Sequence, residues 1–155
     1  MTEKIIIKEN KTLKLTNVLI RDVPQLELMD SQKLLHMMHA FILSKNKMST
    51  GPLIQYSSVK VDENGQPNLV TKFMIQLVDG INEEAPYEFK TMIKQENCLF
   101  SRFEEKEESL NFAYQKMSVY AFENNIKLRG DSYTVFVDRK EDGFIVADIF
   151  MPLKK

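Results

Sequence analysis

The fold is indicated most clearly by the stretch FIVADIFM at residues 144–151. Successive side chains of a β-strand point to opposite faces, so a strand with this sequence is apolar on both sides. Asp148 is the one charged residue in the stretch and would share its face with Phe144, Val146 and Phe150. We therefore predict a strand that helices cover on one face and that other groups cover on the second face.

Two β-hairpins are predicted. One includes this strand, and the other lies earlier in the chain. Residues 132–138 precede this strand across a turn signal at Glu141-Asp142-Gly143. Earlier in the chain, residues 53–61 and 69–78 flank a loop with Asn64-Gly65, which is a strong signal for a tight hairpin turn. Each half of the chain therefore contains an antiparallel pair of strands.

A helix is predicted ahead of each hairpin, because apolar residues recur there at helical spacing. In the first helix these residues are Leu34, Leu35, Met38, Phe41 and Ile42. In the second they are Leu110, Ala113, Tyr114, Met117, Tyr120 and Ala121. We expect the second helix to begin near Glu105, with the acidic residues of 104–108 favourably placed at the positive end of the helix dipole. The alternative for this acidic run is a contact for a basic partner.

Short strands are also predicted before each helix, at residues 4–8, 13–20, 88–94 and 98–103. The order strand, strand, helix, hairpin then occurs twice, in half-repeats of approximately 1–80 and 87–155. We predict a single domain spanning residues 1–155, of the α+β class. It would consist of two pseudo-repeated β-β-α-β-β halves, with an antiparallel sheet and two helices packed on one face.

Composition narrows the classes of function. The chain has 155 residues, with 21 basic residues against 22 acidic ones, and this balance argues against a general nucleic-acid-binding protein. Cys98 is the single cysteine, which excludes a disulfide framework and a zinc site built from several thiolates. The sequence has no run of about 18 apolar residues and no signal-peptide core. We predict a cytoplasmic protein that does not bind membranes.

Several short motifs occur in a characteristic order. They are Gly51-Pro52, Ala113-Tyr114, Met117, Tyr120, Glu123-Asn124-Asn125, Gly130 and the ending from Ala147 to Leu153. In this order they resemble the GyrI-like, or effector-binding, superfamily, and the likeness extends over nearly the whole chain. That superfamily includes ligand-binding domains of MerR- and AraC-type regulators and small gyrase-inhibitor proteins. The chain is also similar to small Firmicute proteins, some of them encoded near secreted LXG-toxin loci.

The resemblance implies a stand-alone module, without a DNA-binding region, that binds a small amphipathic or cationic ligand in a groove between the two halves. The sequence departs from the family at several positions. Tyr120 stands where the family often has Trp, and residues 102–106 replace its usual His-x-Gly-Pro-Tyr. Thr134 and Phe136 stand in place of the Glu and Tyr that some relatives are reported to use as hydrolases. We therefore predict a protein that is not an enzyme and that needs no cofactor.

Asp148 is the leading candidate for ligand contact. The resemblance places it where the family has a strand Glu that contacts cationic ligands in some members. A carboxylate among aromatic rings could hold a lipophilic cation through charge and cation–π contacts. In the alternative interpretation, Asp148 is paired with Arg129, Arg139 or Lys72, or lies at a solvated edge, because an unpaired buried carboxylate is costly.

The full set of predicted ligand-binding residues comprises Asp148, Tyr56, Phe73, Tyr133, Phe136 and Phe150. Aromatic residues in strands can equally belong to an ordinary core. His36 and His39 are three residues apart on the first helix but have no evident third ligand, so no metal site is predicted. Cys98 is expected to be a buried apolar residue rather than a nucleophile.

Three functions remain open from the sequence. The first is a non-catalytic module that binds a small molecule. The second is a protein-interaction or accessory module, like the gyrase inhibitors or the toxin-locus proteins, without a small ligand. The third is a small hydrolase. Exposed sheet edges also leave a homodimer open.

Overall fold

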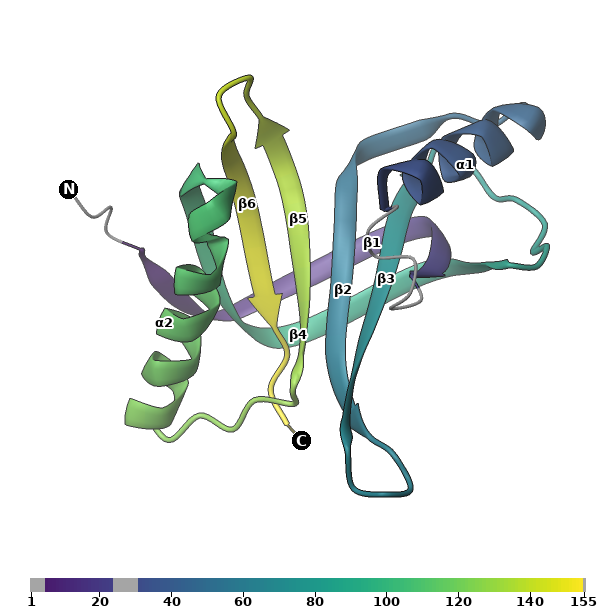
Figure 1. The fold of residues 1–155 in the computed structure, drawn as a ribbon. Coiled ribbons are helices and arrows are strands. Elements are labelled where there is room, and N and C mark those ends of the chain that lie inside the picture. Colours follow the sequence, from purple (N-terminus) through teal and green to yellow (C-terminus); the bar gives the residue numbers. More distant parts are fainter. Residues whose placement is uncertain (1–4, 24–30, 155) are drawn as a thin grey trace. The chain divides into compact units, whose positions relative to one another are not determined.

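The computed structural model describes residues 5–23 and 31–154, and it confirms the α+β class (Figure 1). In these residues six strands and two α-helices follow one another, with one short 3-10 helix. In chain order the elements are β1 (Ile7–Val23), α1 (Ser31–Ser44), β2 (Ser49–Val61), β3 (Pro67–Leu77), β4 (Tyr87–Lys106), η2 (Glu107–Ser109), α2 (Leu110–Glu123), β5 (Asp131–Arg139) and β6 (Phe144–Met151). Neither α-helix of this described part is both long enough and apolar enough to cross a membrane.

The chain forms two compact units, which we call the terminal unit (residues 1–13 and 95–155) and the central unit (residues 14–94). The order of a long strand, a helix and a hairpin occurs twice. In each occurrence the last strand pairs antiparallel with the other two, so β3 lies between β1 and β2, and β6 lies between β4 and β5. The predicted twofold order of a helix followed by a hairpin is therefore confirmed.

The strands before the helices differ from the prediction, because each expected pair of short strands is one continuous strand. β1 and β4 each pass from one compact unit to the other, so the units do not coincide with the two sequence repeats. Asn10 and Asn97 have positive φ values of 59° and 57° within these strands. Asn tolerates the left-handed conformation, so the backbone changes direction there without ending the strand.

The start of α2 also differs from the prediction. The ladder between β4 and β6 continues as far as the pairing of Lys106 with Phe144, and η2 then precedes α2, which begins at Leu110. Glu104 and Glu105 therefore lie in β4 and not in the first turn of a helix. Helical spacing predicts the body of this helix correctly, but strand pairing extends past the first expected helical position.

Each unit has its own apolar core beneath its helix. In the terminal unit α2 covers one face of β4, β6 and β5 (Figure 1). The buried residues of this core are Leu99, Phe103, Ala113, Met117, Ala121, Ile145, Ala147, Ile149 and Met151. In the central unit α1 packs through Leu34, Met38 and Ile42 on a core that includes Phe73 and Ile75. The predicted helix-covered face of residues 144–151 is confirmed, since every second residue of β6 is buried there.

Candidate functional site

Three aromatic side chains form a row across the terminal unit, on the sheet face opposite α2. The strand register places Tyr133 of β5 opposite Phe150 of β6, and Phe150 opposite Phe100 of β4. The rings of Phe100 and Phe150 lie with their centroids 5.0 Å apart and are tilted by 58°. Residues directly opposite on paired strands share a face, so these three rings form one continuous apolar strip, which we call the aromatic row.

An ion pair lies beside the aromatic row on the same face of the sheet. Arg102 is opposite Asp148 in the register of β4 and β6, two residues from Phe100 and Phe150 respectively. Arg102 donates two hydrogen bonds to the carboxylate, from Nε to Oδ1 at 2.7 Å and from Nη2 to Oδ2 at 2.9 Å. The hydrogen bond and charge of Asp148 raise the pKa of Arg102. The Asp148 side chain is 16% exposed and that of Arg102 is 49% exposed, so the pair is open to solvent mainly on the arginine side.

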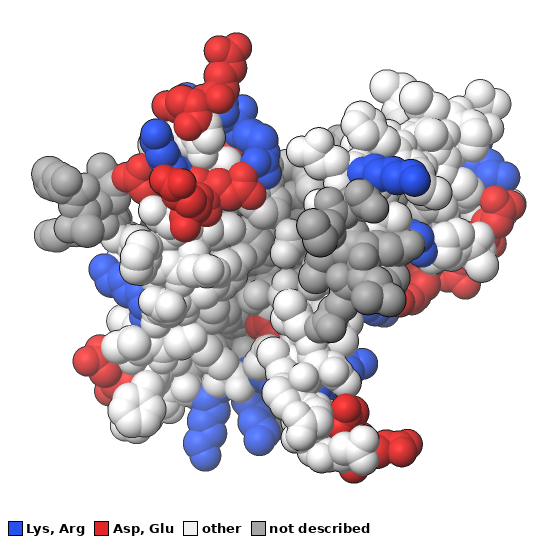
Figure 2. Space-filling view, viewed as in Figure 1, with Lys and Arg blue, Asp and Glu red and all other residues white. Residues whose placement is uncertain are grey.

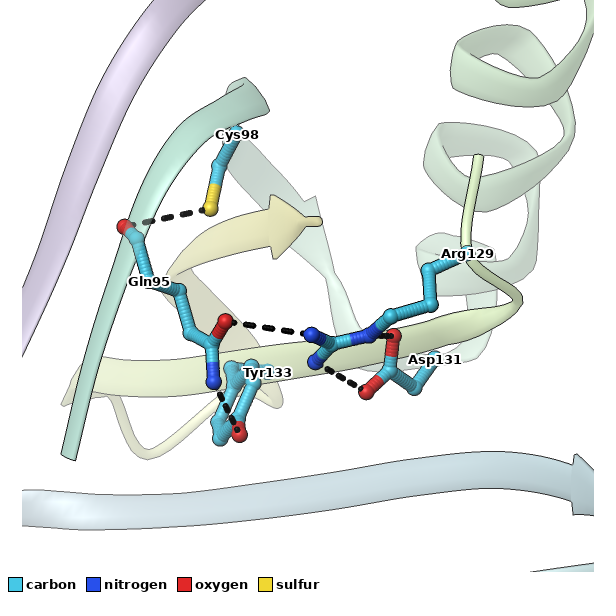
Figure 3. Close-up of polar contacts among 5 residues, drawn as sticks. All are labelled: Gln95, Cys98, Arg129, Asp131 and Tyr133. Carbon is cyan, nitrogen blue, oxygen red and sulfur yellow. Dashed lines mark hydrogen bonds and ion pairs between the residues drawn. The ribbon is translucent and has the colours of Figure 1, made fainter. Parts of the chain in front are cut away.

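A second ion pair lies at the Tyr133 end of the aromatic row. Arg129 donates from Nε and Nη2 to the carboxylate of Asp131, at 2.9 Å and 2.6 Å. Gln95 joins this pair to the row, because its Oε1 accepts from Arg129 and its Nε2 donates to the Tyr133 hydroxyl (Figure 3). Burial raises the pKa of Tyr133, against the opposing effect of the Gln95 hydrogen bond. The phenol is therefore a neutral, oriented group at the end of the row.

A cation already lies over this face. The ammonium of Lys11 is 5.5 Å from the centroid of the Phe100 ring, within the range of a cation–π contact. Aromatic faces carry negative quadrupole charge, so a positive group is attracted to them even without a carboxylate. The arrangement combines apolar area, an affinity for cations and a carboxylate two residues along the strand, and these are the requirements for holding an amphipathic cation.

The structure brings together three of the six predicted ligand-binding residues, namely Tyr133, Asp148 and Phe150. Phe136 lies opposite Ala147, on the face that α2 covers, and packs against the core of the terminal unit. Tyr56 and Phe73 belong to the central unit. Phe73 is part of the core beneath α1, which is the alternative interpretation for these aromatics. Tyr56 is half-buried and lies opposite Lys72, on the other face of that sheet.

The partner of Asp148 differs from the three cations considered for it. Each of those pairs with another carboxylate: Arg129 with Asp131, Arg139 with Glu107, and Lys72 with Asp22. The correct partner, Arg102, depends on the register of β4 against β6, and register is not visible in a single sequence.

Part of the site could have been found by sequence pattern. Phe100 and Arg102 are two residues apart in an alternating run, which places them on one face of a strand. Gln95, Arg129 and Asp131 carry no such signal. They meet because the part of β4 around Gln95 lies beside the start of β5 in the folded unit (Figure 3).

The side chains of Cys98 and Thr134 are both buried. Cys98 is fully buried, its thiol donates to the Gln95 carbonyl at 3.5 Å, and burial raises its pKa. Thr134 is buried beneath α2, where its hydroxyl hydrogen-bonds with that of Tyr114. Within residues 5–23 and 31–154, no three His, Cys, Asp or Glu side chains gather closely enough to hold a metal ion.

The fold is shared with proteins of known structure. The C-terminal domain of EcmrR has a TM-score of 0.69 and 16% identity, over 100% of this chain and 99% of that domain. In the EcmrR–DNA complex this chain spans 57% of the EcmrR chain, with a TM-score of 0.70 and 16% identity over 98% of its own length. At such identities the likeness concerns the fold alone.

Two further structures share the fold at lower identity. SAV2435, in its structure bound to tetraphenylphosphonium, has a TM-score of 0.51 and 13% identity, over 98% of this chain and 94% of that one. A hydrolase encoded by lin2189 from Listeria innocua has a TM-score of 0.60 and 9% identity, over 97% of this chain and 92% of that one. These neighbours are consistent in fold with the effector-binding resemblance.

Sequence comparison gives a more specific result. The family model described as "Domain of unknown function (DUF5085)" matches residues 14–152. No curated protein matches the chain.

Proposed function

This chain belongs to the DUF5085 family, and we propose that it is a non-catalytic module that binds a small amphipathic cation against the aromatic row of the terminal unit. The observation that carries the proposal is the row itself, with Phe100, Phe150 and Tyr133 side by side and a carboxylate one strand step away. The apolar groups of a ligand would lie against the half-buried rings of Phe100 and Phe150, beside the buried ring of Tyr133, and its positive charge would lie toward Asp148.

The ion pair gives the proposed site a defined electrostatic behaviour. Without ligand, Arg102 neutralises Asp148, so burial of the carboxylate is compensated. A ligand cation near Asp148 competes with the guanidinium for the same charge. Arg102 is half exposed, so it can move toward solvent when a cation approaches, and the cost of displacing it offsets part of the attraction between the cation and Asp148. Binding therefore depends mainly on apolar contact with the rings, and the charge of the ligand adds selectivity.

Two features support a module without catalysis. Thr134, which stands where some relatives have a reported catalytic Glu, is buried and hydrogen-bonded beneath α2, away from the aromatic row. The Cys98 thiol is fully buried, and its raised pKa lowers the fraction of reactive thiolate. Neither group has the exposure that a nucleophile or a general base needs.

The proposal is tested by binding of tetraphenylphosphonium, the cation held by the structural neighbour SAV2435. We expect isothermal titration calorimetry to detect binding by the wild-type protein, and Phe150→Ala to weaken that binding at least tenfold. Phe112→Ala is the matched control, because Phe112 is 66% exposed on α2 and lies outside the aromatic row. Circular dichroism of each variant separates loss of the site from loss of the fold.

Two results would refute the proposal. The first is no binding at millimolar concentrations of tetraphenylphosphonium and of other aromatic cations. The second is binding that Phe150→Ala and Phe112→Ala affect equally, since ligand contact with the rings predicts a clear difference between these variants.

A further inference from the structure

One face of α2 is apolar although it is exposed. Phe112, Val119 and Phe122 are 66%, 55% and 85% exposed, and they lie seven and three residues apart along the helix. Residues at this spacing form one stripe along a helix. The stripe lies opposite Ala113, Met117 and Ala121, which α2 buries in its own unit. A surface helix normally carries polar residues on that outer face.

Charged residues flank this stripe on one edge. Lys116 and Glu123 are seven residues apart, so they lie on the same side of the helix two turns from each other. Among the described residues neither has an ion-pair partner. Figure 2 shows the surface over α2 as largely uncharged, with acidic side chains gathered beyond its N-terminal end.

The two charges on this edge of α2 are complementary to the same two charges of a second, antiparallel copy of the helix. In a symmetric pair of antiparallel helices, the twofold axis is perpendicular to both helices and brings each edge of the stripe against the same edge of the second copy. With the axis beside Val119, midway between Lys116 and Glu123, each Lys116 lies level with Glu123 of the second copy. Two ion pairs then lie along one edge of a core in which Phe122 packs toward Val119 of the other molecule.

We propose that the α2 stripe is a self-association surface, on which a second copy of this chain packs its own α2 in the antiparallel direction. A stripe on a single helix is smaller than the roughly 1,600 Å² that a standard stable interface buries. The dimer is therefore weak, with an expected dissociation constant of about 10–100 μM. This inference is independent of ligand binding, because the stripe lies on α2 and the aromatic row lies on the opposite side of the sheet.

Sedimentation velocity of the full chain between about 5 and 200 μM, a range that brackets the expected dissociation constant, tests the surface. We expect the weight-average mass of the wild type to rise with concentration, and Val119→Glu and Phe122→Glu to remain monomeric. Leu43→Glu is the matched control, because Leu43 is an apolar residue on α1 whose 70% exposure lies between those of Val119 and Phe122. It should self-associate as the wild type does.

A charge-swap experiment tests the orientation. Lys116→Glu alone and Glu123→Lys alone should each weaken association several-fold, because like charges then meet. An equimolar mixture of the two variants should recover association. In the mixed dimer the glutamate introduced at position 116 of one copy meets the lysine introduced at position 123 of the other, and the two unchanged residues form the second pair. A wild type that stays monomeric at the highest concentration, a dimer that survives Phe122→Glu, or a mixture that gives no recovery would each overturn the proposal.

Discussion

Replacing Arg102 by methionine removes the partner of Asp148 and keeps most of the side-chain volume. The change has two separable consequences. The protein loses a bidentate ion pair and so becomes less stable. The Asp148 carboxylate beside the aromatic row also becomes an uncompensated negative charge. Arg102→Met should therefore weaken the fold while strengthening the binding of aromatic cations.

The size of the loss in stability depends on how far the ion pair between Arg102 and Asp148 is exposed to solvent. Exposed ion pairs contribute about 0.2–1 kcal/mol, whereas removing one partner of a buried pair costs about 3–5 kcal/mol. With Asp148 16% exposed and Arg102 49% exposed, the pair lies between these limits, and we expect a cost of about 1–2 kcal/mol. In a domain of this size that corresponds to a decrease in Tm of about 2–8 °C.

The gain in affinity follows from Coulomb's law. A monovalent cation about 6 Å from an unpaired carboxylate gains about 0.7 kcal/mol in water and about 3 kcal/mol at an effective dielectric constant of about 20. These energies correspond to roughly threefold and roughly one hundredfold tighter binding. The half-exposed position of Arg102 favours the lower part of this range, so we expect a gain of about three- to tenfold for tetraphenylphosphonium.

A double-mutant cycle with Arg102→Met, Asp148→Asn and the combined variant provides the assay, with calorimetry for affinity and thermal melting for stability. The gain should be absent in the combined variant, because the added negative charge is then removed. If Arg102→Met binds the cation no more tightly than the wild type, or if the combined variant keeps the gain, Asp148 does not attract the ligand and the electrostatic part of the account is refuted.

Two other expectations concern stability. Met117 is fully buried under α2, so Met117→Ala opens a cavity there and should lower the free energy of unfolding by about 2–5 kcal/mol, measured by urea denaturation. The control Phe112→Ala, at an exposed residue, should cause almost no change. Equal effects of the two variants would contradict the assigned core. Burial raises the pKa of Cys98, so above the ordinary thiol pKa the unfolded chain releases this proton while the folded chain retains it. The corresponding stability is complete below about pH 8.5 and is lost as the pH rises further, so thermal melts from about pH 8 to 10 should show a steeper decline for the wild type than for Cys98→Ala. Parallel declines would show that the thiol titrates alike in both states.

The alternation in FIVADIFM was sufficient to predict both faces of β6. Ile145 and its alternate neighbours are buried under α2, and Asp148 shares the other face with Phe150, as expected. Helical spacing and the Asn-Gly turn likewise located both helices and the first hairpin. These features are local, because side-chain periodicity and turn chemistry act over a few residues.

The features that were missed depend on contacts between distant residues. The pairing of Arg102 with Asp148 requires the register of two strands that bring together residues 46 positions apart in the chain. The sequence groups Phe136 with the ligand-binding aromatics, whereas the register of β5 against β6 places it opposite Ala147, on the face that α2 covers. The continuity of β1 through Asn10 also has no local signal, since a left-handed Asn is as typical of a turn as of a bent strand.

The central claim is that the aromatic row of the terminal unit contacts the ligand, and nuclear magnetic resonance tests it most directly. In a titration of the isotopically labelled protein with tetraphenylphosphonium, ring currents of the ligand should shift resonances of Phe100, Tyr133 and Phe150 most, with those of Arg102 and Asp148 next. Resonances of α2 residues such as Phe112 should move little. Largest shifts outside the aromatic row, or no saturable shifts at all, would contradict the account.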